Sequence, residues 1–229
     1  MIERVPWEQF ERAFTWKQGE HIALIGPPGA GKTTVMDAIK DRRSFNIFFG
    51  TKPADPLYQK LIKEGYRHIQ SFSEIKQFDS NNFLLWPKFA KTIPETMEIQ
   101  ERVFRNALDR IVEQGGWTLW IDETKYTAEM LGLRKEISFC VDQLRSNNSS
   151  VICGAQRPAW LPQSVLANAT HVFLWKSTNR EDQIKLADVG GIDAKVVRDE
   201  AKSLGSHEFI YIKTRGVNSK MVISQVKRK

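Results

Sequence analysis

The stretch that decides the fold is Gly26-Pro27-Pro28-Gly29-Ala30-Gly31-Lys32-Thr33-Thr34. It follows a short apolar run, residues 22–25, and leads into a stretch with helical periodicity. In the pattern GxxxxGK[ST], glycines let backbone N–H groups curl around phosphate oxygens, and the following helix N-terminus favours an anion. A strand, this loop and a helix in that order predict a phosphate-binding loop. An ordinary Gly/Pro loop would not explain why Lys and Thr occupy their two positions.

Each residue of the loop has an expected task in binding a nucleotide. All nine residues from Gly26 to Thr34 are expected to surround the phosphates. Lys32 adds positive charge near the β- and γ-phosphates, and the Thr33 hydroxyl is suited to coordinate Mg²⁺. The loop therefore predicts ATP as the ligand and Mg²⁺ as its companion ion.

Length and charge bound the class of protein. A chain of 229 residues suits one α/β domain with a full core. The formal net charge is +7, and the excess is uneven, because residues 201–229 hold seven basic groups and one acidic group. Such a basic section suits nucleic acid or an anionic surface. A solvated face with a frayed basic C-terminus explains the charge equally well.

Cysteine usage and hydropathy point to a cytoplasmic protein. Cys140 and Cys153 have neither CxxC spacing nor a nearby His, which favours reduced thiols and no zinc site. The first residues lack the apolar core of a signal peptide. No apolar run approaches the ~18 residues needed to span a membrane, so we expect no direct membrane insertion.

Apolar runs separated by turn residues predict strands that alternate with helices. Strands are expected over residues 21–25, 45–49, 83–86, 117–121, 150–154 and 171–175, and helices over residues 6–15, 32–41, 56–64, 94–114, 127–146, 180–188 and 193–204. Residues 208–213 and 220–224 flank Gly216 and predict a terminal hairpin. This alternation is typical of an α/β fold with a mostly parallel central sheet and helices on both faces.

The pattern is consistent with a single domain, residues 1–229. Residues 1–19 would form an N-terminal helical extension, residues 20–205 the core, and residues 206–229 a basic C-terminal hairpin and tail. In the extension, Trp7 and Phe14 have helical spacing. We expect them to pack against the core, although either ring is also suited to stack on an adenine.

An acidic pair ends one of the predicted core strands. Asp122 follows residues 117–121 at the point where a parallel strand's carboxyl end would face the phosphate loop. A carboxylate there can hold Mg²⁺, and Glu123, one residue on, can orient and deprotonate an attacking water. This arrangement predicts hydrolysis of a nucleoside triphosphate. The simpler alternative is a polar strand exit with no catalytic part.

The next strand, residues 150–154, runs into Ala155-Gln156-Arg157-Pro158. A glutamine that leaves a central strand beside the acidic pair can hydrogen-bond a γ-phosphate or the attacking water. It would then report the state of the nucleotide to the rest of the protein. Spacing alone fits Gln156 to a turn as well as to a sensor, and both interpretations stay open.

The order of these motifs resembles that of the FtsK–HerA superfamily of DNA-pumping ATPases, which have a RecA-like (ASCE) P-loop NTPase core. The likeness spans roughly residues 20–215 and is carried by residues 26–34, 48–53, 120–123, 151–158 and 172–191. The sensor strand and the Gly190-Gly191 segment are its more specific parts. Gly50 stands where the second strand of that superfamily usually has Asp, which alters a minor contact.

This resemblance implies a ring, commonly a hexamer, with nucleotide at subunit interfaces. A neighbouring subunit would supply an arginine that stabilises charge on the transferring phosphate. Arg145 and Arg134 are the first candidates and Arg157 a further one, although each also fits a surface or DNA-facing role. The compact core resembles the genome-packaging ATPases of membrane-containing icosahedral viruses.

The leading hypothesis is ATP-driven translocation of double-stranded DNA, with Glu123 as general base and Lys32 as phosphate stabiliser. Thr33 and Asp122 would hold Mg²⁺, and Gln156 would couple hydrolysis to DNA-facing loops. A viral protein would work in the host cytoplasm or at a virion vertex, docked on a capsid, portal or membrane protein. DNA contacts would be to backbone phosphates and independent of sequence.

Other hypotheses remain open at this point. A cellular or plasmid DNA-transfer ATPase would share these motifs. An ATPase that remodels proteins would usually add a helical lid, for which residues 179–204 are short. A non-enzymatic nucleotide switch would not need Glu123. A nucleoside monophosphate kinase is disfavoured by the Asp-Glu strand end and Gln156.

Overall fold

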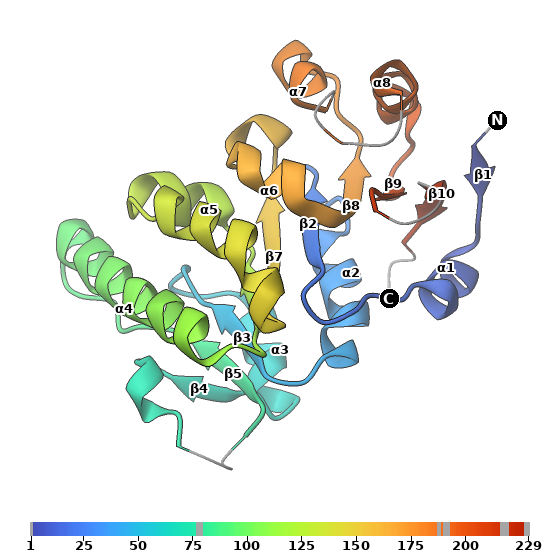
Figure 1. Cartoon of the computed structure of the whole chain (residues 1–229). Helices are drawn as coiled ribbons and strands as arrows, with labels where there is room; N and C mark the ends of the chain where they lie inside the picture. Colours follow the sequence, from blue (N-terminus) through green and yellow to red (C-terminus); the bar gives the residue numbers. More distant parts are fainter. Residues whose placement is uncertain (1, 77–79, 187–188, 190–192, 216–219, 227–229) are drawn as a thin grey trace.

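The computed structural model describes residues 2–76, 80–186, 189, 193–215 and 220–226. Within these residues ten strands form one sheet in the order β1-β10-β9-β8-β2-β7-β6-β3-β5-β4 (Figure 1). The strands are β1 Glu3–Arg4, β2 His21–Ile25, β3 Asn46–Phe49, β4 Arg67–Ile69, β5 Asn82–Leu85, β6 Thr118–Ile121, β7 Ser150–Ala155, β8 Ala169–Trp175, β9 Glu208–Lys213 and β10 Lys220–Gln225.

The helices connect these strands in the alternation that the sequence predicts. The α-helices are α1 Trp7–Ala13, α2 Lys32–Ile39, α3 Pro56–Lys63, α4 Ile93–Gln114, α5 Arg134–Gln143, α6 Gln163–Asn168, α7 Arg180–Lys185 and α8 Ala194–Ser203. The shorter turns are the 3₁₀ segments η1 Lys40–Arg42, η2 Phe72–Glu74, η4 Leu144–Asn147 and η5 Pro158–Trp160, and the π turn η3 Tyr126–Met130. No helix in the described part of the chain is long and apolar enough to cross a membrane.

Strand directions confirm the predicted fold class. All neighbours from β8 to β4 pair in parallel, whereas β9 is antiparallel to β8 and β10 is antiparallel to β9. The terminal hairpin therefore extends the sheet, and β1 pairs in parallel with its outer strand. Because β7 lies between β2 and β6, the acidic pair reaches the phosphate loop across one intervening strand.

Two layers of helices cover the sheet (Figure 1). Helices α1, α2 and α3 bury aromatic and aliphatic side chains against one face, together with Trp120 and Trp175 from the strands. Helices α4, α5, α6 and α8 cover the other face, where Phe104 and Ile137 are fully buried. The parallel strands are buried on both faces, which explains why their sequences are continuous apolar runs.

Caps set the helix ends close to where the sequence places them. Helix α3 begins at Pro56 because the Asp55 carboxylate accepts the Leu57 N–H at 2.8 Å. Helix α4 ends at Gln114 and is capped by Gly115, whose φ of +69° is open to glycine at little cost. The predicted boundaries of residues 56–64 and 94–114 are thus confirmed within a residue.

The single helix predicted over residues 127–146 is wrong. A π turn, η3, occupies the first residues of this range. The helical conformation is interrupted at Gly132 (φ +68°), and α5 begins at Arg134. Helix α6 and strands β1 and β4 were not predicted, because two to six residues are too few to display a period. The predicted helix over 180–188 begins as α7, and its last two residues lie outside the described part.

Candidate nucleotide-hydrolysis site

The phosphate loop connects β2 to α2 and is tied to the sheet at its start. The Gly26 N–H donates to the Ala155 carbonyl at 3.0 Å, so the loop leaves β2 beside the end of β7. A Cβ at Gly26 would lie 2.7 Å from the Trp175 Cβ, which leaves no room for a side chain. Gly31 has φ +113° and caps α2. These two glycines are therefore required by close packing and by backbone conformation.

Lys32 turns back onto the loop that carries it. Its ammonium donates to the carbonyls of Gly26 at 2.5 Å and Pro27 at 3.0 Å. Burial lowers the pKa of Lys32, and the charge of Lys52 adds to this, while the carboxylates of Asp122 and Glu123 oppose it. Among the described residues this half-buried cation donates only to carbonyls, and it is poised to exchange them for the stronger acceptors of a phosphate group.

The acidic pair lies at the end of β6, against β7. A Cβ at Gly154 would lie 2.6 Å from the Asp122 carbonyl oxygen and 2.8 Å from its Oδ1. Gly154 therefore lets Asp122 approach the neighbouring strand closely. Burial raises the pKa of Asp122, and Glu123 adds to this, while the charges of Lys52 and Lys32 oppose it. Cations from two neighbouring loops thus face this carboxylate.

Lys52 is the member of this site that the motifs did not identify as functional. Its ammonium lies 2.9 Å from Glu123 Oε1, 3.7 Å from Asp122 Oδ2 and 3.0 Å from Asp55 Oδ2. Burial alone would lower the pKa of Lys52, but hydrogen bonds to Glu123 and Asp55 outweigh it and raise the pKa. The signal available in the sequence was its position just after the strand predicted over residues 45–49.

A fixed turn carries Lys52. The Trp86 indole N–H donates to the Lys52 carbonyl at 2.8 Å, and the Thr51 N–H donates to the Tyr58 hydroxyl at 3.0 Å. A Cβ at Gly50 would lie 2.9 Å from the Trp86 ring. Trp86 therefore leaves no room for a side chain at this position.

Gln156 lies at the end of β7, half-buried and beside the loop after β6, as its place in the sequence predicts. Arg157 is held by Asp182 at 3.1 Å and Glu181 at 3.2 Å within its own chain. The Arg134 guanidinium lies 2.8 Å from Glu129.

Arg145 is exposed on η4, which precedes β7. It is separated from Gln156 by the whole length of that strand, roughly 20 Å at about 3.3 Å per residue. Within this chain Arg145 therefore lies at the opposite end of the strands from the phosphate loop. It could serve as the arginine that contacts the phosphates only from a neighbouring copy of the chain.

Two hollows flank the phosphate loop. One of about 260 Å³ is lined by residues 27–30, Trp175, Lys176 and residues 205–208, and the other, of about 320 Å³, reaches Thr33, Thr34 and Val226. The end of β10 therefore forms one wall of the site. Trp7 and Phe14 take no part in it, because their rings pack against Phe10, Phe209 and Tyr211.

The donor set of the site fits Mg²⁺. Thr33 in the first turn of α2 supplies a hydroxyl, and Asp122 supplies a carboxylate, both of which are hard oxygen ligands. Mg²⁺ usually takes one or two protein oxygens and completes its shell with water and substrate phosphates. The described residues contain no group of three His, Cys, Asp or Glu side chains that could hold a metal ion by themselves.

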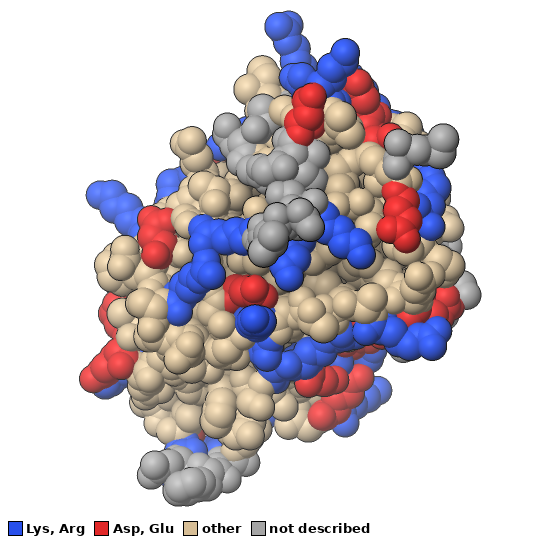
Figure 2. All heavy atoms as spheres, turned by 45° about the vertical axis from the view of Figure 1, so that its right-hand side comes forward, with Lys and Arg blue, Asp and Glu red and all other residues tan. Residues whose placement is uncertain are grey.

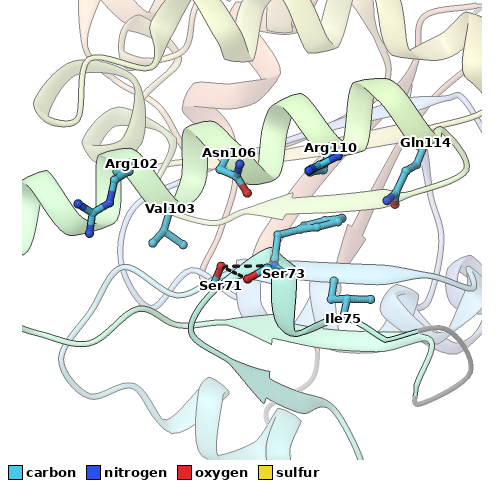
Figure 3. Close-up of a pocket in the computed structure, with 9 residues that line it drawn as sticks. Ser71, Ser73, Ile75, Arg102, Val103, Asn106, Arg110 and Gln114 are labelled. Atoms are coloured by element: carbon cyan, nitrogen blue, oxygen red, sulfur yellow. Dashed lines mark hydrogen bonds between the residues drawn. The ribbon is translucent and has the colours of Figure 1, made fainter.

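A further hollow of about 490 Å³ lies away from the phosphate loop, between η2 and α4 (Figure 3). Arg102, Asn106, Arg110 and Gln114 project into it from successive turns of α4, opposite Ser71 and Ser73. None of the candidate catalytic residues lines it. It is a separate surface feature.

Solved structures share this architecture over nearly the whole chain. The genome-packaging NTPase B204 of Sulfolobus turreted icosahedral virus 2 superposes with a TM-score of 0.68 over 93% of this chain and 100% of that one, at 14% identity. The chain shares the fold of this packaging NTPase. VirB4 of Thermoanaerobacter pseudethanolicus matches over 91% of this chain and 89% of that one, with a TM-score of 0.65 and 10% identity.

The chain also resembles curated ATP-binding proteins over about half of its length. The sulfate/thiosulfate import ATP-binding protein CysA of Brucella melitensis is 31% identical over 132 residues, which is 54% of this chain and 34% of that protein. The chain thus spans about a third of the length of the curated relatives it matches. No protein-family model matches the chain. These relatives share ATP binding with the packaging NTPase, and this agreement supports a P-loop ATPase.

Proposed function

We propose that this protein is an ATP-hydrolysing translocase of double-stranded DNA, working as a subunit of a viral genome-packaging motor. The observation that carries the proposal is the meeting of Lys32, Asp122 and Glu123 at one sheet edge, on a chain that superposes over nearly its whole length on a packaging NTPase. The phosphate loop provides for ATP binding. The acidic pair adds the groups that hydrolysis needs.

In this proposal each residue has one part in the reaction. Lys32 exchanges its loop carbonyls for the β- and γ-phosphates of ATP and stabilises their charge. Glu123 accepts a proton from the water that attacks the γ-phosphorus, and Gln156 orients that water. Thr33 and Asp122 would hold Mg²⁺, which supplies further positive charge at the phosphates when bound.

The charge distribution supports DNA as the polymer. Figure 2 shows Lys and Arg side chains in a band across one face of the molecule, interrupted by a few carboxylates. In the terminal hairpin, Lys213 and Lys220 stand directly opposite each other in the register of β9 and β10. Like charges in that position are unfavourable by themselves, and an anionic partner would relieve them. DNA phosphates are such a partner.

The proposal includes assembly into a ring, commonly a hexamer. A neighbouring subunit would bring Arg145 or Arg134 to the phosphates, and Arg145 is the better candidate because no acidic partner holds it among the described residues. Arg157 is less suited, since Asp182 and Glu181 already bind it. A capsid, portal or membrane protein at the virion vertex would dock the ring, and the host cytoplasm is where it would act.

Steady-state ATP hydrolysis with and without long double-stranded DNA tests this function. We expect DNA to stimulate the wild type and Glu123→Gln to abolish the stimulated rate while nucleotide binding persists. Stimulation should weaken steeply between 50 and 200 mM salt, since each phosphate contact releases counterions. Failure of DNA to raise the rate at any salt contradicts the proposal.

A second candidate is transfer of DNA or protein between compartments. It is favoured by the likeness to VirB4 and to the cytoplasmic domain of the type VII secretion ATPase EccC of Thermomonospora curvata, which superposes with a TM-score of 0.56 over 92% of this chain and 25% of that one, at 11% identity. Stimulation by single-stranded DNA or polypeptide, without stimulation by duplex DNA, would select this function.

A further inference from the structure

Lys52 occupies a position that conflicts with the proposed chemistry of Glu123. A general base must present a free lone pair to water, but the Lys52 ammonium lies 2.9 Å from Glu123 Oε1. An ammonium at this distance occupies that carboxylate oxygen and fixes the orientation of the Glu123 side chain. The arrangement in the structure is therefore one in which the base is restrained.

The same lysine has a second partner that would receive it on release. Asp55 Oδ2 lies 3.0 Å from the Lys52 ammonium, and Asp55 is fixed because its other oxygen caps α3. The Lys52 side chain is 37% exposed, and the backbone of the turn that carries it is held by the hydrogen bond from Trp86 to the Lys52 carbonyl. Lys52 can leave Glu123 while keeping Asp55, so the ammonium does not lose all of its ion-pair partners.

A buried link joins the turn that carries Lys52 to the chain that follows Glu123. Gln100, fully buried on α4, donates to the Thr51 carbonyl at 3.2 Å and accepts from the Tyr126 hydroxyl at 2.7 Å. Tyr126 begins η3, three residues after Glu123. A shift of η3 would therefore move Gln100 and, through it, the turn that carries Lys52.

We propose that Lys52 is a positioning residue whose ion pair keeps Glu123 from acting as base. When the site engages DNA, Lys52 leaves Glu123 and keeps only its ion pair with Asp55. This rests on the proposed role of Glu123. Lys52 itself touches neither water nor phosphate in this proposal. It controls how often Glu123 is available.

A double-mutant cycle in urea unfolding tests whether the pair exists, with no need for activity. We compare wild type, Lys52→Met, Glu123→Gln and the double variant. Lys52→Met is expected to shift the unfolding midpoint by about 0.3 M, the size expected of a partly exposed ion pair, and by less than half of that in the Glu123→Gln background. Equal shifts in the two backgrounds overturn the proposal.

Basal hydrolysis without DNA tests the restraint. Lys52→Met should raise the basal rate by about twofold to fivefold and reduce the ratio of DNA-stimulated to basal rate, because a partly exposed ion pair biases an equilibrium by that factor. Lys52→Arg should keep the wild-type basal rate. The matched control is Lys60→Met on α3, where a similarly exposed lysine binds Asp37 and Glu64 away from the site. It should change neither rate.

The outcomes separate the two proposals. A basal rate that falls in Lys52→Met overturns the restraint and makes Lys52 a contributor to catalysis. A wild type that hydrolyses no ATP contradicts the proposed function, and the unfolding cycle then still decides whether Lys52 holds Glu123.

Discussion

The parallel sheet carries charged groups at its carboxyl edge, where the strands end, and at its amino edge, where they begin. The two sets of groups differ in how far they are exposed to solvent. At the carboxyl edge, Lys52, Asp122 and Glu123 interact while their side chains stay 18–37% exposed. At the amino edge, the fully buried His171 has Nε2 3.0 Å from Glu20 Oε2 and Nδ1 2.9 Å from the Tyr211 hydroxyl. Charge that stays accessible suits a ligand, whereas charge that is enclosed and fully hydrogen-bonded suits the fold.

This difference predicts that changes at the carboxyl edge alter activity with little cost in stability, and that changes at the amino edge lower stability with little effect on activity.

The largest expected effect is at Lys32. Lys32→Met should lower ATP hydrolysis by about 10²–10³-fold, the cost of losing one charge-stabilising donor. The unfolding midpoint should stay unchanged or rise, because burial already disfavours the Lys32 ammonium and lowers its pKa. Steady-state kinetics and urea unfolding measure the two effects, with the exposed Lys63→Met as control. If Lys32→Met lowered the free energy of unfolding by as much as it raised the activation free energy of hydrolysis, the predicted difference between the two edges would be wrong.

A medium effect is expected at Gly154. Gly154→Ala places a methyl group 2.6 Å from the Asp122 carbonyl oxygen, so Asp122 must shift. A displacement of about 1 Å at a reacting centre costs up to ~10²-fold in rate, and we expect hydrolysis to fall by about 10- to 100-fold.

The comparison variant is Gly65→Ala, between α3 and β4. Gly65 has φ +91° and open space around it. This change should cost about 1–2 kcal/mol of stability through backbone strain and leave kcat intact. If Gly154→Ala and Gly65→Ala have the same profile, the tight contact with Asp122 has no functional meaning.

The smallest effect concerns pH at the amino edge. Burial, with the charges of Arg145 and Arg215, lowers the pKa of His21 from 6.5 to about 4. Between these values the unfolded chain binds a proton that the folded chain does not, so the stability present above pH 6.5 is lost as pH falls toward 4. The loss for this group is at most about 1.4 kcal/mol per pH unit.

Urea unfolding at pH 7.0, 6.0 and 5.0 measures this slope where ordinary carboxylates are still mostly ionised. The Val151 N–H donates a hydrogen bond to His21 Nδ1 at 3.0 Å. His21→Asn keeps an acceptor for this N–H and removes the titratable imidazole. We expect a shallower slope in this variant. Equal slopes would show that His21 does not carry the pH dependence.

Much of the fold was predictable because its signals are local. The phosphate loop, the buried strands and the capped helix α4 each follow from neighbouring residues, through backbone freedom at glycine, apolar runs and orphan N–H groups. The break at Gly132 was not predicted, since a period of 3.6 continues across one glycine at little apparent cost. The strands β1 and β4 form only because longer strands offer them a paired edge.

The candidate site was predictable in part. Lys32, Asp122 and Glu123 are identified by motif and by position at strand ends, and their catalytic roles stay predictions, as does that of Gln156. The roles of Arg134, Arg145 and Arg157 also remain untested. Arg157 illustrates the limit, because its partners Glu181 and Asp182 lie 24 and 25 residues further along the chain.

The sequence by itself determined the local features of this protein: a glycine-rich loop with the GxxxxGK[ST] pattern, an acidic strand end and an α/β alternation, all of which are set by residues that lie near one another along the chain. Only the tertiary structure decided that Lys52 holds Glu123, that Gly50 makes room for Trp86, and that Gly154 admits Asp122. Each of these contacts joins segments from different strands, and strand order is set by the packing of the whole core.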